Sequence, residues 1–62
     1  MWSEIRRAPN LMIAEMWKEY LEGEGIPARI LPDGLVSSEA VSYRVLVPEL
    51  KLHIVEEILR KL

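Results

Sequence analysis

The most informative segment of the sequence is Leu21-Glu22-Gly23-Glu24-Gly25-Ile26-Pro27-Ala28, because it marks the end of a helix and the start of a strand. A left-handed Gly25 would make Leu21 and Ile26 the two contacting side chains of a Schellman cap. Pro27 cannot continue a helix, because it lacks the backbone N–H and its ring clashes with the preceding turn. The stretch therefore predicts a helix that stops before Gly25 and an extended chain after it.

The beginning of this helix is marked by Asn10, whose side-chain oxygen can accept a hydrogen bond from an N–H group of the first turn. At about 100° per residue, one face of the helix is apolar and predicts a core stripe. Its members are Ile13, Ala14, Trp17 and Leu21.

Three other segments have the composition of strands. Residues 2–8 alternate weakly and precede a proline, and residues 26–31 alternate before the turn signature Pro32-Asp33-Gly34. Residues 43–47 are β-branched and aromatic, and their apolar run favours a central strand. Between the last two strands, residues 35–42 predict a long hairpin loop.

A second helix is predicted from Pro48, because a proline in the first turn costs no hydrogen bond. We expect two ion pairs between residues four apart on its polar side, Glu56–Arg60 and Glu57–Lys61. The predicted core face consists of Leu52, Val55, Ile58, Leu59 and Leu62.

The predicted order is thus β-α-β-β-α within a single α+β domain, residues 1–62. A β-α-β crossover leaves a gap that the third strand can fill as an antiparallel neighbour of both others. This gives a three-stranded antiparallel sheet of strand order 1-3-2 with two helices on one face, which is a ferredoxin-like split β-α-β whose final strand is missing. The first strand should then be an open edge that invites pairing.

Composition narrows the function classes. The chain has 62 residues, a formal net charge of −2 and no cysteine. No apolar run is long enough to span a bilayer, so we expect no membrane partner. There is no secretory pattern either, and we expect a cytoplasmic protein. The negative net charge argues against nucleic acid as a partner.

Small size points to association, because a domain of about 60 residues buries too little surface to be more than marginally stable. We therefore expect a homodimer or a contact with an unknown protein partner. The first helix offers a candidate surface in Met12, Met16 and Tyr20, which extend its apolar arc beyond what one sheet face covers. Two interpretations stay open: the second helix covers this row, or the row forms an interface, to which Trp2 on the open strand could contribute.

The face of the sheet opposite the helices is a second candidate surface. Alternation places Arg29 and Arg44 there, and the same pattern adds Arg6 together with Trp2. Arginines beside an aromatic ring on an open sheet are typical of binding sites for anions, nucleotides or RNA. An ordinary amphipathic outer face, with Glu4 pairing an arginine, is the simpler interpretation.

The residues give little basis for an enzyme. His53 is the single histidine, and we expect it on the polar face of the second helix without a neighbouring nucleophile. The carboxylates Glu15, Glu19 and Glu22 are interleaved with Lys18 and favour a solvated stripe over a metal site. We therefore predict no catalytic residue, no cofactor and no metal site.

Several segments resemble a family of small prokaryotic signal-transducing proteins, a domain of unknown function related to the nitrogen-regulatory PII proteins. The strongest likeness is the segment from Leu21 to Ala28, and weaker ones are Ala8-Pro9-Asn10 and Val45-Leu46-Val47-Pro48-Glu49. The resemblance implies a ferredoxin-like fold and a regulatory role, without implying any catalytic or ligand-binding residue. The sequence thus predicts a non-catalytic regulatory or interaction domain, with anion, nucleotide or RNA binding as the alternative.

Overall fold

The computed structural model of the chain describes the backbone of residues 1–36 and 39–62, with side chains for residues 1–34 and 42–62. Its elements follow the predicted order. They are β1 (Trp2–Ala8), α1 (Leu11–Gly23), β2 (Arg29–Val36), β3 (Glu39–Pro48), a short 3-10 helix η1 (Glu49–Lys51) and α2 (Leu52–Arg60). The antiparallel sheet has the order β1-β3-β2, so the predicted α+β class and strand order 1-3-2 are confirmed.

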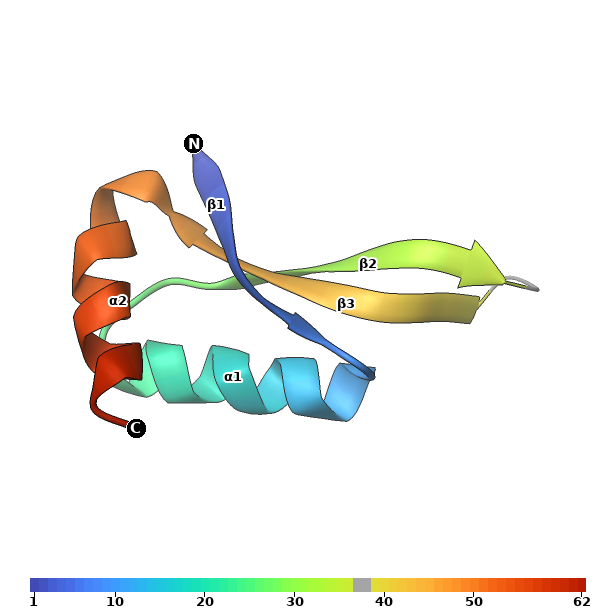
Figure 1. Cartoon of the computed structure of the whole chain (residues 1–62), viewed down its shortest axis with the longest axis horizontal. Coiled ribbons are helices and arrows are strands. Elements are labelled where there is room, and N and C mark those ends of the chain that lie inside the picture. Colours follow the sequence, from blue (N-terminus) through green and yellow to red (C-terminus); the bar gives the residue numbers. More distant parts are fainter. Residues whose placement is uncertain (37–38) are drawn as a thin grey trace.

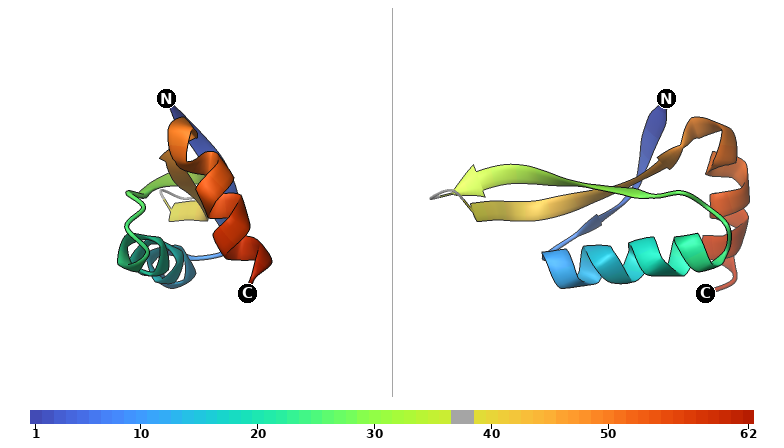
Figure 2. Two further views of the ribbon diagram at one scale, coloured as in Figure 1. Left: turned by 90° about the vertical axis from the view of Figure 1, so that its left-hand side faces the viewer. Right: turned by 180° about the vertical axis from the view of Figure 1, so that it is seen from behind.

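The core lies between the sheet and the helices. α1 runs along one face of the sheet, and α2 crosses the end of that layer (Figure 1; Figure 2). Among the described side chains, the largest that are fully buried are Leu21 of α1, Val45 and Val47 of β3, and Val55 of α2. Because β3 has a strand on either side and a helix beneath it, its apolar run is buried as a central strand requires.

Both predicted ends of α1 are confirmed. The Asn10 side chain accepts a hydrogen bond from the Ile13 N–H at 2.9 Å. At the other end the Ile26 N–H donates to the Leu21 carbonyl at 2.9 Å, and the Gly25 N–H donates to the Glu22 carbonyl at 3.0 Å. With Gly25 at φ 84°, these two bonds form the Schellman cap.

The hairpin differs from the prediction. β2 begins at Arg29 rather than Ile26 and continues through the proposed turn, with Pro32 opposite Tyr43 and Asp33 opposite Ser42. A proline is tolerated because β2 is an edge strand with a free side, and Gly34 takes up a positive φ of 66° within it. β3 in turn begins at Glu39, so the predicted loop 35–42 is wrong over most of its length. Its residues 37–38 lie outside the described residues.

The second helix is also shorter than predicted, because the chain forms η1 before α2 begins at Leu52. Most of the predicted core face packs against the core, but Leu62 lies beyond the helix and is exposed. Glu57 pairs with Arg60, three residues on, at 3.4 Å, in place of the two predicted pairs. Within the described residues, neither helix has the length and apolar character needed to cross a membrane.

Candidate interaction surface

The row Met12, Met16 and Tyr20 on α1 faces away from the sheet. These side chains are 73%, 59% and 37% exposed, respectively. α2 does not cover them, because it packs across the end of the sheet rather than along this side of α1 (Figure 1). Of the two interpretations left open by the sequence, coverage by the second helix is therefore wrong for this row.

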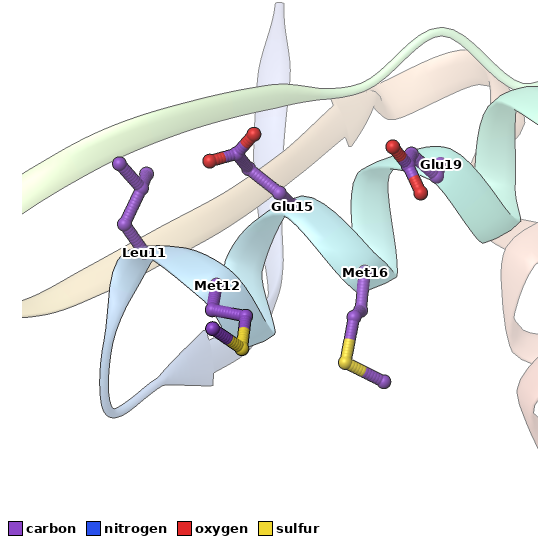
Figure 3. A pocket seen from close by; sticks show the side chains of 5 residues that line it. All are labelled: Leu11, Met12, Glu15, Met16 and Glu19. Carbon is purple, nitrogen blue, oxygen red and sulfur yellow. The ribbon is translucent and has the colours of Figure 1, made fainter.

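A groove of about 370 Å³ lies on one side of the row (Figure 3). We call it the acidic groove, because two carboxylates form its edge beside the methionines. It is lined by Leu11, Met12, Glu15, Met16 and Glu19. The spacing of four residues places Glu15 and Glu19 above one another on the helix, and neither forms an ion pair within the described part of the chain.

A second groove, of about 360 Å³, lies on the other side of the row and is almost wholly apolar. We call it the aromatic groove, and its lining consists of Ile13, Met16, Trp17, Tyr20 and Leu62. The rings of Trp17 and Tyr20 meet edge to face, with centroids 6.4 Å apart at 83°. Met16 lines both grooves and forms the ridge between them.

The side chain of Arg6 lies beside the aromatic groove. The Arg6 guanidinium lies 4.4 Å from the centroid of the Trp17 ring. This cation–π contact holds an exposed charge in place without neutralising it, and Arg6 has no acidic partner among the described residues. The α1 surface is therefore apolar along its middle, negative along one side and positive along the other.

Arg6 reaches α1 because β1 contains a bulge. Glu4 pairs with Leu46 of β3, but Arg6 pairs with Val45, so Ile5 is an extra residue in the strand. Beyond the bulge the alternation is reversed, which turns Arg6 toward the helices and Arg7 toward the open face. The sequence pattern, which assumed an unbroken strand, placed Arg6 on the open face and missed Arg7.

The other residues predicted for the open face do lie there, but each is engaged within the chain. The Arg29 guanidinium stacks on the Trp2 ring at 4.4 Å, and Arg44 donates to Glu4 at 2.7 Å. Trp2 thus belongs to this face and is separate from the α1 row.

Arg7 contacts Asp33 at 2.8 Å and also Glu4 at 3.4 Å. The Arg44 guanidinium, followed by that of Arg7, lowers the pKa of Glu4, and Glu4 in turn raises the pKa of Arg44. Arginines that are already paired with carboxylates or covering a ring make a poor site for an added anion. This arrangement therefore favours the simpler interpretation of an amphipathic outer face.

The two edges of the sheet are both interrupted. β1 carries the bulge at Ile5, and β2 carries Pro32, which cannot donate a ladder hydrogen bond. Bulges and prolines are the common means by which edge strands avoid pairing with other chains. Association through the open first strand therefore has less support than association through α1.

His53 is exposed on α2, and it has no hydrogen-bond partner within the described residues. The sequence also did not single out Leu11 or Leu62 for the α1 surface, although both contribute to its grooves. Leu11 could have been found from its place in the first turn, beside Glu15. Leu62 could not, because its position depends on where α2 ends.

Comparison of the chain with family models, with curated proteins and with solved structures gave no match. The fold and surfaces described above are therefore the basis for a function.

Proposed function

We propose that this chain is a small non-catalytic interaction domain of the cytoplasm that acts as a homodimer formed through the α1 surface. The observation that carries the proposal is the exposed row Met12, Met16 and Tyr20, with the acidic groove on one side and the apolar aromatic groove on the other. Methionine and tyrosine are enriched at protein interfaces, where methionine adapts its shape to the opposing surface.

The size of the chain supports the same conclusion. Among the residues whose side chains are described, the largest that are fully buried are one leucine and three valines, and a domain of about 60 residues is only marginally stable by itself. Covering α1 with a second copy would remove further apolar surface from water and so stabilise both copies. The resemblance to signal-transducing proteins favours a regulatory role for this dimer.

Light scattering on the whole chain over a dilution series tests this proposal. We expect a dimer that persists at high salt, because apolar burial is not screened by ions. Met16→Glu should dissociate it at the same concentration, since the change places a charge on the ridge between the grooves.

The matched control is Leu50→Glu, which adds the same charge at a leucine of η1 that is 95% exposed and lines neither groove. This variant should remain dimeric. A monomer at every concentration, or a dimer that Met16→Glu leaves intact, contradicts the proposal.

A further inference from the structure

The charges beside the two grooves indicate the relative orientation of the two copies in a dimer. We propose that α1 of one copy packs parallel to α1 of a second copy, with Arg6 of each lying against Glu15 and Glu19 of the other. This inference rests on the proposed function, because it specifies the geometry of the same dimer.

The side chains around α1 form two flanks of opposite charge. At 100° per residue, Met16 lies between two flanks of α1, with Glu15 and Glu19 on one side of it and Trp17 on the other. The two grooves confirm this order, because each combines Met16 with the residues of one flank. Arg6 is fixed over Trp17 and therefore belongs to the second flank.

The two copies of a closed homodimer are related by a two-fold axis that uses the same patch on both copies. When the axis runs perpendicular to the helices, they are antiparallel and each flank meets its own copy. Glu15 and Glu19 would then face two like charges, and Arg6 would face Arg6. When the axis runs along the helices, they are parallel and each acidic flank meets the partner's basic flank.

The charges of the two copies also match in their positions along the helix axis. In a parallel two-fold pair, each residue lies at the same height as its own copy. Trp17 is halfway in sequence between Glu15 and Glu19, so the Arg6 guanidinium above it would lie between the two carboxylates of the other copy. The apolar row would meet itself in register, with Met12 near Met12 and Met16 near Met16.

Cysteine cross-linking tests this geometry directly, because the chain contains no cysteine of its own. We expect Met12→Cys to form a disulfide-linked dimer in oxidised glutathione. Met16→Cys should do the same and serves as the positive control, since Met16 lies on the axis in either orientation. An equimolar mixture of Met12→Cys and Tyr20→Cys tests the antiparallel alternative, in which those two positions face each other.

Charge reversal provides a second readout that needs no cross-link. We expect Glu15→Arg with Glu19→Arg to raise the dimer Kd about tenfold, because both copies of the contact are lost. Arg6→Glu should have a similar effect, and the triple variant should recover part of the lost affinity, because a carboxylate at position 6 meets two arginines but lacks the contact with Trp17. Glu15 and Glu19 are exposed, so the double variant tests the contact without disturbing the core.

The outcomes separate this inference from the proposed function. A mixed Met12→Cys and Tyr20→Cys cross-link, or a Kd that charge reversal leaves unchanged, overturns the parallel geometry while the dimer stands. Absence of a cross-link at position 16 in a protein that is dimeric by light scattering overturns the α1 interface itself. A protein that is monomeric at all concentrations contradicts both the parallel geometry and the proposed dimer.

Discussion

The guanidinium of Arg29 lies 4.4 Å above the Trp2 ring, although the two residues belong to strands on opposite sides of β3. The contact therefore crosses over the central strand on the face that no helix covers. Leu46 of β3, which pairs with Arg29 in the sheet, is only 6% exposed. The salt bridge of Arg7 to Asp33 crosses β3 in the same way further along the sheet. On this face of the sheet, side chains from the two edge strands cover the central strand, which no helix covers there.

This contact predicts a measurable coupling between the two residues. Trp2→Ala should destabilise the fold, because it removes the half-buried ring on which the Arg29 guanidinium stacks. In a double-mutant cycle with Arg29→Gln, the interaction energy should be about 0.5–1 kcal/mol, the usual value for an exposed cation–π pair. Urea unfolding of the four proteins gives this energy. Strict additivity of the two changes would show that the stacking contributes nothing.

The network around Glu4 predicts a dependence of stability on pH. Arg44 and then Arg7 lower the pKa of Glu4 below its ordinary value of 4.5. The unfolded chain thus takes up this proton at a higher pH than the folded chain does. The stabilisation is complete above the ordinary pKa and is lost as the pH falls through the lowered pKa of the folded state.

Glu4→Gln should accordingly be less stable than the parent protein at pH 6, and the difference should shrink as the pH is lowered toward 3. Urea unfolding at intervals of half a pH unit measures this trend. Glu56→Gln is the control, because Glu56 is exposed and has no ion pair among the described residues. A difference between the parent and Glu4→Gln that stays constant with pH would contradict the role given to this carboxylate.

The glycines that end α1 predict opposite effects for the same substitution. Gly25→Ala should cost ~1–2 kcal/mol, because its φ of 84° is left-handed. Gly23→Ala should stabilise the protein by ~0.5–1 kcal/mol, because Gly23 is the last residue of the helix proper. An added Cβ meets nothing within 4 Å at either site, so the backbone alone decides the sign. Equal effects in thermal unfolding would refute the Schellman cap as the reason for Gly25.

The burial of Leu21 predicts a large loss of stability when its side chain is shortened. Leu21 is completely buried and also supplies the carbonyl that the Ile26 N–H contacts. Leu21→Ala should cost ~2–5 kcal/mol, which is enough to unfold a marginally stable domain of this size. Leu50→Ala removes the same atoms from an exposed leucine and should change stability by less than ~0.5 kcal/mol. Circular dichroism during urea unfolding compares the two, and a folded Leu21→Ala with near-parent stability would be inconsistent with this core.

Local sequence features were sufficient to predict the elements and their order. The caps at Asn10 and Gly25 depend on residues within one turn of each other, so local chemistry was sufficient to predict both ends of α1. The apolar run of β3 likewise identified the central strand, because burial on both faces removes the need for alternation. From these elements the strand order followed by topology alone.

Which side chains share a surface depends on long-range pairing and could not be predicted from local sequence features. Pro32 and Gly34 are turn residues by composition, yet they lie in an edge strand, because pairing with β3 stabilises the extended chain more than a local turn would. The bulge at Ile5 has no local signal and arises where β1 meets β3, and it transfers Arg6 from the open face to the side of Trp17. A one-residue shift in a strand exchanges the two faces of the sheet, so long-range pairing, rather than sequence pattern, fixes the charges beside α1.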